Sequence, residues 1–407
     1  MADFGAADLD TFRAEVRAWL AANYPPELRD ADAKTDAEAV WGGRAFEGSD
    51  DPQSVWMRRV AAQGWTTPTW PKAYGGAGLT AQQARVIDQE LAAGRYRPPL
   101  LSFGIWMLGP VLLEYANEEQ KTEHLPKIVR GEIRWCQGYS EPGAGSDLAS
   151  LATKCEDKGD HWQIDGQKVW TSYADKADWC FCLVRTDPTK KHEGISFVLI
   201  DMRLPGVETR PIKLISGESP FCETFFTGVK IPKGNLVGKV NGGWEIAKRL
   251  LQYERQNISA GFGDGGSVGG GAAGDVSEIA KQYVGLEDGR LADADLRQRI
   301  TLNKMNFQAL RQTIGRTAAE SRAANGPSAA TSIIKYAAAE FARERSELMV
   351  EALGDQGLGW SGDGFSEAER LAVRGWLRAK ANSIEGGTSE VNLNVVSKRV
   401  LGLPDPK

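Results

Sequence analysis

The sequence predicts an α+β fold with an N-terminal α-helical domain (residues 1–131), a middle antiparallel β domain (132–240) and a C-terminal four-helix bundle (241–407). Two observations lead to this prediction. At 407 residues the chain is too long for one ordinary hydrophobic core, so two or three domains are expected. The spacing of apolar residues is helical in the first and last parts, and it alternates in short runs in the middle.

The first part contains helical patterns separated by proline-rich and polar stretches. Four apolar residues at helical spacing predict the first helix: Leu9, Phe12, Val16 and Leu20. Further helices are predicted over 55–64, 80–94 and 103–130. The stretch from 65 to 78 is rich in proline and glycine, so we expect it to cross a surface or line a cleft.

The middle and last parts differ in the period of their apolar residues. Alternating runs predict strands over 162–164, 179–184, 195–201, 207–211 and 221–229. Helical patterns return over 244–258, 296–324, 328–353 and a terminal segment to 401. Residues 261–275 interrupt this bundle with eight glycines. No Lys-Ser or Lys-Thr follows them, as a phosphate-binding loop requires, so we expect a flexible insertion or a broken helix.

The composition is typical of a globular protein. Hydrophobic residues make up 42% and charged residues 25%, and a net charge of −5 without a long basic run argues against a nucleic-acid partner. Neither a signal peptide nor an apolar run long enough for a membrane span is found. The five cysteines are scattered, so a cytoplasmic location is expected. Cys180 and Cys182 alternate with apolar residues and have no second ligand pair nearby, which indicates buried strand positions and no metal site.

Two stretches carry the functional prediction. The first is Tyr139–Asp147, where Gly143 and Gly145 permit backbone conformations that a Cβ forbids. Amides in such a loop can form a concave nest for an anion or an electron-rich ring edge, with the hydroxyls of Tyr139, Ser140 and Ser146 at its rim. The second is Trp170-Thr171-Ser172, which ends a predicted strand and offers an aromatic surface and two hydroxyls to a planar cofactor. Taken alone, each is more often an ordinary turn or strand end.

With Trp65–Gly76 (WTTPTWPKAYGG) upstream and Gly386–Glu390 (GGTSE) near the end, the chain resembles the acyl-CoA dehydrogenase family. The resemblance covers nearly the whole chain in the family's order, and Glu141–Asp147 is among its most specific signatures. It implies FAD as cofactor, an acyl-CoA as substrate and a trans-2-enoyl-CoA as product. It also implies an electron-transfer flavoprotein as partner and an oligomer, either a dimer or a tetramer.

The reaction needs a carboxylate that removes the α-proton while a flavin accepts the β-hydride at N5. In many members of the family this base precedes the Gly-Thr of the C-terminal motif, where this chain has Gly386. In others, of a bacterial type, it lies on the first helix of the C-terminal domain within a Glu-Arg pair, which matches Glu254-Arg255 here. The resemblance therefore implies Glu254 as the base and leaves Glu385 as the reserve candidate.

Further roles follow from position in the family's motifs. The residues expected to contact the cofactor are Tyr139, Ser140, Gly145, Ser146, Trp170, Thr171, Ser172, Lys281, Thr388 and Glu390. Those expected to contact the substrate are Ser146, Tyr253, Arg255, Gly386 and Gly387. Among these, Ser172 is placed near flavin N5, the Gly386 amide is the donor to the thioester oxygen, and Arg255 lies by the CoA moiety.

Two stretches depart from the family's pattern. Lys281–Gly285 has Lys and Val where relatives reach a neighbouring subunit's FAD with Arg and Phe, and Glu351–Gly357 places acids where a phosphate is expected. These departures fit a hetero-oligomer in which a partner chain completes the site, and similar traits occur in relatives that act on sterol side chains. Two alternatives stay open: a monooxygenase or oxidase on the same fold, and a CoA-binding subunit without catalytic activity.

Overall fold

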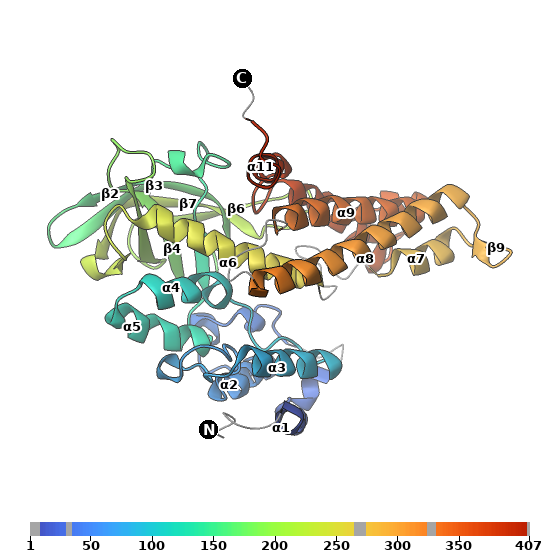
Figure 1. Cartoon of the computed structure of the whole chain (residues 1–407), viewed down its shortest axis with the longest axis horizontal. Helices are drawn as coiled ribbons and strands as arrows, with labels where there is room; N and C mark the ends of the chain where they lie inside the picture. The colour runs from blue at the N-terminus through green and yellow to red at the C-terminus, as the bar shows by residue number, and fades with distance from the viewer. Residues whose placement is uncertain (1–8, 30–34, 264–273, 324–330, 405–407) are drawn as a thin grey trace. The chain divides into compact units, whose positions relative to one another are not determined.

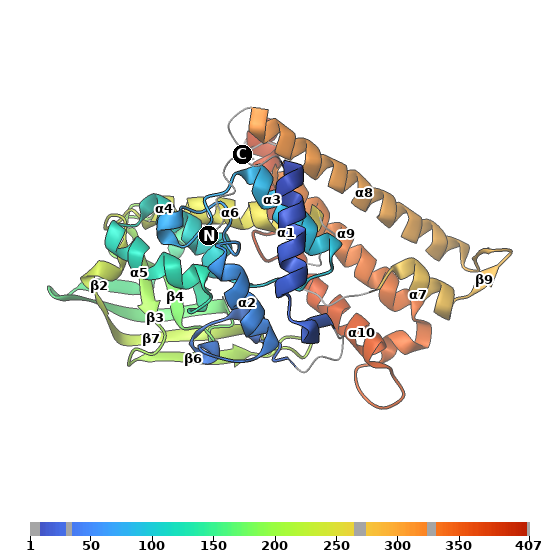
Figure 2. The same cartoon turned by 90° about the horizontal axis from the view of Figure 1, so that it is seen from below.

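The computed structural model describes residues 9–29, 35–263, 274–323 and 331–404, and the chain forms two compact units. The first unit comprises Met1–Ile212 and Pro220–Tyr253, and the second comprises Lys213–Ser219 and Glu254–Lys407. Figure 1 and Figure 2 show the chain from two directions, coloured along the sequence. The predicted division into three domains stays a prediction, because compactness groups the N-terminal helices and the sheet together.

The first unit begins with five α-helices. They are α1 (Leu9–Asn23), α2 (Pro52–Ala62), α3 (Ala81–Ala93), α4 (Gly109–Tyr115) and α5 (Glu118–Val129). In α1, Phe12, Val16 and Leu20 are fully buried, as their spacing predicts, and they pack against α2 and α3. Thr80 and Gln83 form a capping box at the start of α3. The helix predicted over 103–130 is wrong in one respect, because it is interrupted between α4 and α5.

The eight strands of the first unit form one sheet in the order β6-β7-β3-β2-β4-β5-β8, with β1 beside β4. The strands are β1 (Trp135–Gly138), β2 (Lys154–Asp157), β3 (His161–Ser172), β4 (Trp179–Arg185), β5 (Ile195–Asp201), β6 (Val207–Ile212), β7 (Phe221–Pro232) and β8 (Leu236–Val237). The prediction of a purely antiparallel sheet is wrong for β1–β4 and β2–β4, which pair in parallel. β1, β2 and β8 are too short to give an alternating signal of their own.

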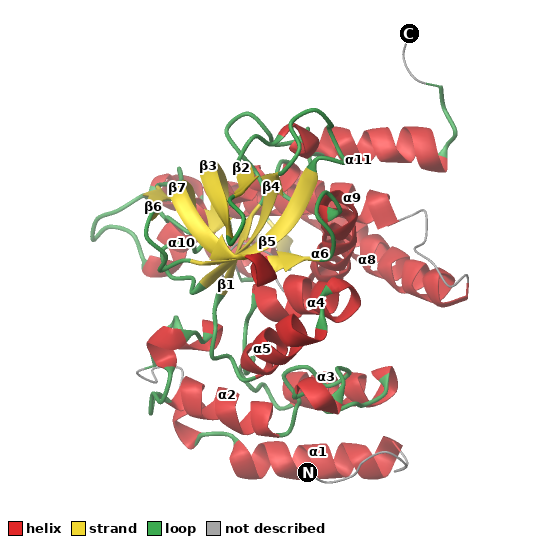
Figure 3. Cartoon of the chain, turned by 90° about the vertical axis from the view of Figure 1, so that its left-hand side faces the viewer, coloured by secondary structure: helices red, strands yellow, loops and turns green. Residues whose placement is uncertain are grey.

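The central strands β4 and β5 are buried on both faces of the sheet. Phe181 and Leu183 of β4 pack in a core that includes α4, α5 and the first half of helix α6 (Gly243–Gly263), whereas Cys180 and Cys182 face a second core formed by strands and the turns between them. Figure 3 shows α4 and α5 on one side of the sheet. Both cysteines are fully buried and free, as the alternation predicts.

The second unit consists of helices and one small hairpin. Its elements are the end of α6, then α7 (Val276–Tyr283), β9 (Leu286–Glu287), β10 (Arg290–Leu291), α8 (Ala294–Ala323), α9 (Thr331–Ala352), α10 (Glu367–Ala379) and α11 (Ser389–Val395). The terminal segment is thus divided, and α7 and the hairpin were not predicted. Most of the glycine-rich stretch 261–275 lies outside the described residues. No helix in the described part of the chain has the length and apolar character needed to cross a membrane.

Candidate functional site

The loop after β1 is a tight turn that backbone hydrogen bonds close and that the Glu141 side chain joins to the sheet. Glu141 and Ala144 exchange two backbone hydrogen bonds, each 3.0 Å long. A Cβ at Gly143 or Gly145 would meet no atom within 4 Å, so the outer side of the turn is open. The Ser146 side chain is exposed and Ser140 is half-buried. Neither Gly143 nor Gly145 has a φ in the left-handed region, so the turn does not need the backbone conformations that a Cβ forbids. The nest of amides stays a prediction.

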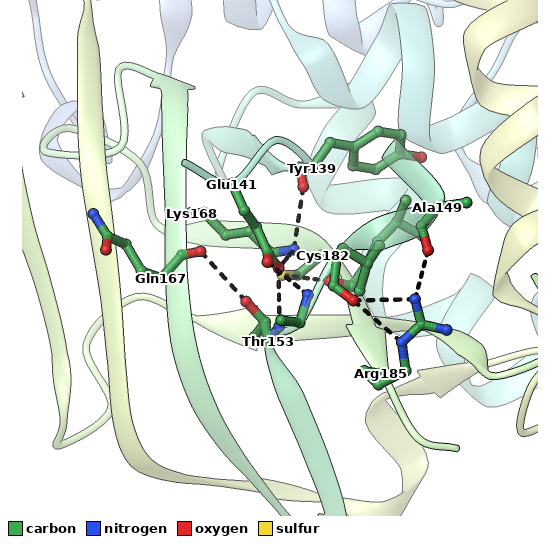
Figure 4. A network of polar contacts seen from close by, with 11 residues as sticks. Tyr139, Glu141, Ala149, Thr153, Gln167, Lys168, Cys182 and Arg185 are labelled. Carbon is green, nitrogen blue, oxygen red and sulfur yellow. Dashed lines mark hydrogen bonds and ion pairs between the residues drawn. The ribbon is translucent and has the colours of Figure 1, made fainter. Parts of the chain in front are cut away.

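The Glu141 carboxylate anchors this turn to the sheet. It accepts hydrogen bonds from the Ala152 amide at 2.6 Å and the Thr153 amide at 3.0 Å. The Lys168 ammonium lies 2.7 Å from the same carboxylate and 3.1 Å from the Tyr139 carbonyl oxygen. Figure 4 shows Glu141, Lys168, Thr153 and the Tyr139 carbonyl oxygen joined in one network of polar contacts. The Lys168 side chain is fully buried and that of Glu141 is 8% exposed, so this is an ion pair of the protein interior.

Burial raises the pKa of Glu141, but the charge of Lys168 and the hydrogen bonds to the carboxylate outweigh it and hold the pKa below its ordinary value of 4.5. Sequence reasoning missed this pair. Lys168 is in phase with the buried Trp162 and Ile164 on β3, so the alternation placed a lysine among core positions. A lysine at such a position requires a buried acid, and that signal could have identified Glu141.

The two predicted motifs lie side by side in the first unit. The Val169 amide donates to the Ser140 carbonyl oxygen at 2.9 Å, which joins the turn to β3 next to Trp170. Trp170 has a φ of 60° and sits in a β-bulge, where β3 advances by one extra residue against β7 between Lys168 and Thr171. This backbone conformation is strained for a large aromatic residue. Trp170 is 54% exposed, and the ring of Phe221 lies edge-on to it with the ring centroids 6.0 Å apart.

The remaining residues of the two motifs differ in exposure. Ser172 is half-buried at the end of β3. Thr171 is fully buried, and its hydroxyl has no hydrogen-bond partner among the described residues. The predicted position of Tyr139 at the rim is wrong, because its ring packs against Phe181 in the sheet core. A broad exposed indole beside a hydroxyl and an open turn of amides fits the ring and edge of a flavin.

The second unit carries the C-terminal motif. Gly386 and Gly387 have φ values of 63° and 92°, which only glycine adopts without strain. Thr388 caps α11 by accepting from the Val391 amide, and Glu390 lies exposed in the first turn of that helix. The Asn392 amide group donates to the carbonyl oxygens of Gly387 and Thr388 at 3.0 Å each. The turn is therefore a defined structure.

The two candidate bases have different surroundings. Both oxygens of Glu385 are bound by the Arg378 guanidinium, at 2.7 and 3.3 Å. Glu254 lies on α6 and is half-buried, with its Oε2 atom shielded from solvent. The buried ammonium of Lys335 is within electrostatic reach of Glu254. Arg255 follows in α6, and its side chain lies outside the described structure.

Two predicted contact residues are engaged by the protein itself. Tyr253, the last residue of the first unit, bonds through its hydroxyl to Glu114 and accepts from Arg249 at 2.8 Å. Burial and then Glu114 raise its pKa to about 12. Lys281 on α7 forms an ion pair with Glu278 at 2.6 Å. Both terminal nitrogens of the Arg299 guanidinium donate to the Glu351 carboxylate. This ion pair offsets the negative charge of one of the acids in the altered stretch 351–357.

Comparisons with known proteins agree with this architecture. Family models match the chain in order: acyl-CoA dehydrogenase N-terminal domain over 6–132, middle domain over 136–229 and C-terminal domain over 241–401. The chain is 35% identical over 399 residues to acyl-CoA dehydrogenase IpdE1 of Mycobacterium tuberculosis, covering 98% of both.

Solved structures give the same result. The Tcur3481-Tcur3483 steroid ACAD matches with a TM-score of 0.73 and 27% identity, covering all of both chains. The ChsE4-ChsE5 complex from Mycobacterium tuberculosis matches with a TM-score of 0.72 and 26% identity, again over both whole chains.

Proposed function

The chain belongs to the acyl-CoA dehydrogenase family, and from this premise we propose that it is an FAD-dependent enzyme that converts an acyl-CoA thioester into the trans-2-enoyl-CoA. The family implies a flavin, and the residues that favour one here are on the first unit. The observation that supports the proposal most directly is the hydrogen bond that joins the Glu141 turn to the strand carrying the strained, exposed Trp170.

We assign the cofactor contacts to groups that the structure leaves open. Trp170 would cover one face of the ring, and Ser172 would donate a hydroxyl near it. Ser140, Gly145 and Ser146 would offer amides and hydroxyls of the turn to the ring edge and the pyrophosphate. Tyr139 and Thr171 have buried side chains, so their share would come from the backbone. When bound, the flavin supplies the acceptor for the β-hydride.

Glu254 is the proposed base for the α-proton. Glu254 lies within electrostatic reach of the Lys335 ammonium, and its position in α6 matches the Glu-Arg pair of the family. Glu385 is the poorer candidate, because the Arg378 fork engages both of its oxygens.

The remaining assignments concern the thioester and CoA. The Gly386 amide would bind the thioester oxygen, where negative charge develops as the proton leaves, and Gly387 would border it. Arg255 would bind CoA phosphate, with Tyr253 beside it. Thr388, Glu390 and Lys281 would contact the cofactor.

The test uses anaerobic flavin bleaching by four thioesters: octanoyl-, isobutanoyl-, 3-phenylpropanoyl- and cholanoyl-CoA. Glu254→Gln should abolish bleaching by the best of them, while Glu385→Gln should leave most of it. Normal bleaching in Glu254→Gln together with its loss in Glu385→Gln would move the base to Glu385.

We further propose that the natural acyl group is bulky or ring-bearing and that the enzyme works as a hetero-oligomer, with an electron-transfer flavoprotein as acceptor. The similarity to the Tcur3481-Tcur3483 steroid ACAD and to the ChsE4-ChsE5 complex supports this. The Lys281–Glu278 pair supports it too, because a lysine already paired is a weak substitute for a fork on phosphate. Size-exclusion chromatography and the FAD-to-chain ratio of protein expressed alone test it, and a fully loaded homotetramer would contradict it.

A further inference from the structure

Lys335 is a buried cation in the second unit, and the proposed function gives it no role beyond its charge near Glu254. It lies in the first turns of α9 and is 7% exposed. Its ammonium donates to the Asn382 carbonyl oxygen at 2.7 Å. Burial lowers the pKa of Lys335, and the carboxylates of Glu385, Glu340, Glu254 and Glu390 oppose this change, in that order. A methionine or leucine would fill the same space without the cost of removing an ammonium from water.

The partner of Lys335 lies at one end of a specific loop. Asn382 belongs to the 3-10 turn Lys380–Ser383, and the chain then passes through Gly386 and Gly387 to α11. At the other end of the loop, the buried Ser389 hydroxyl lies 3.3 Å from Glu340 Oε1. Lys335 and Glu340 both project from α9, so one helix holds both ends of the segment 382–389.

Between these two points few side chains of the loop pack against the described part of the unit. Gly386 and Gly387 have no side chains to pack, and the adjacent Ile384 is 66% exposed. The Arg378–Glu385 pair and the two bonds from Asn392 join the loop to its own flanking helices, α10 and α11, which also pack on α9. The direct bonds from Lys335 and Glu340 add to this packing at the two ends of the loop and so contribute to where the Gly386 amide points.

We infer that Lys335 is a positioning residue that, together with Glu340, clamps the segment 382–389 onto α9 and so orients the Gly386 amide as a hydrogen-bond donor. The inference rests on the proposed function for the role of that amide, but the clamp itself is a property of this unit alone. An amide displaced by about 1 Å from a developing oxyanion loses much of its effect, and such displacements reduce rates by about 100-fold.

The first experiment tests the clamp without substrate. Backbone hydrogen exchange of the holoenzyme is compared for the wild type, Lys335→Met and Lys304→Met. The last is the control, because Lys304 is half-exposed on α8 and pairs with Asp275 away from the loop. Lys335→Met should speed exchange in residues 384–389 by at least about 10-fold, and Lys304→Met should leave it unchanged. Unchanged exchange in Lys335→Met would overturn the clamp.

The second experiment separates positioning from general damage. The rate of flavin reduction at saturating thioester, with whichever of the four thioesters bleaches the wild type best, should fall about 10- to 100-fold in Lys335→Met, while the half-saturating concentration changes less than about 2-fold. Ser389→Ala removes the longer of the two bonds to α9, the one to Glu340, and little side-chain volume. It should give a smaller fall in the limiting rate of flavin reduction, again with little change in the half-saturating concentration. A rise in the half-saturating concentration with an unchanged limiting rate would overturn the positioning role. If no thioester bleaches the wild type, the catalytic part falls with the proposed function, and hydrogen exchange alone decides the clamp.

Discussion

The buried Glu141–Lys168 pair predicts an asymmetric response to mutation. In Glu141→Gln the fully buried ammonium of Lys168 keeps the Tyr139 carbonyl oxygen but loses its counter-charge, so the expected loss is about 3–5 kcal/mol of unfolding free energy. In Lys168→Met the carboxylate still accepts from the amides of Ala152 and Thr153. Because these two donors remain, the expected loss is about 2–3 kcal/mol. The acid is thus the more costly partner to remove.

The double variant decides whether the two charges act as a pair. Once Lys168 is replaced by methionine, the neutral amide of glutamine no longer faces an uncompensated charge. The double variant should therefore recover about 2–3 kcal/mol relative to the sum of the single losses. Urea unfolding at pH 7, followed by tryptophan fluorescence on all four proteins, measures this coupling. The exposed pair Glu156–Lys158 is the matched control, and Glu156→Gln should leave the unfolding midpoint unchanged.

The same pair fixes the sign of a pH dependence. The pKa of Glu141 is lowered in the folded protein, so its contribution is complete above the ordinary value of 4.5 and is lost as the pH falls through the lower, folded value. Glu141→Gln should lack this loss on acidification. Additive single losses, or an equal acid response in wild type and Glu141→Gln, would refute the view that the turn is held by an ionised pair.

Three further predictions follow from other parts of the first unit. Burial lowers the pKa of His124 from 6.5 to about 4, so the folded protein resists protonation of this ring. The free energy of unfolding of the wild type should therefore fall by about 2 kcal/mol between pH 7 and pH 5, and that of His124→Phe should not show this loss. Urea unfolding at both pH values measures the difference. Trp170→Gly relieves the backbone strain at a φ of 60°, so the melting temperature of the apoprotein should be no lower than that of the wild type. The dissociation constant of the flavin, measured by fluorescence titration, should rise at least about 10-fold because the aromatic surface is lost. A Cβ on Gly243 would lie 2.4 Å from the Ser196 carbonyl carbon, so Gly243→Ala should lower the free energy of unfolding in urea by about 1–3 kcal/mol. Gly234→Ala is the control, because a Cβ there would meet no atom within 4 Å, and it should leave this free energy unchanged.

Local patterns predicted the elements that bury one regular face. Phe12, Val16 and Leu20 of α1 face the core as their period predicts, whereas Leu9 at the start of the helix is exposed. The alternation in β4 also predicted a strand correctly, although its side chains are buried on both faces. The parallel pairing of β1 with β4 depends on the path of the chain between them, and no local period encodes that path. The same holds for Arg378 and Glu385, whose contact depends on how α10 ends, and for Tyr253, whose partner Glu114 lies on α4.

The exposed position of Trp170, a proposed cofactor contact, is the clearest case of a feature that the period alone predicts wrongly. Buried side chains of β3 fall at even numbers up to Lys168, so a regular strand would bury residue 170 as well. The pairing moves from Lys168 opposite Thr224 to Thr171 opposite Cys222, which is three residues on β3 against two on β7. The extra residue shifts burial to Thr171 and leaves Trp170 outside. Lys168 is the last paired residue before the shift, and its ion pair with Glu141 joins the turn to this point of β3. Weakening that pair should therefore loosen the turn and the Trp170 bulge together, which are the two parts of the proposed cofactor wall.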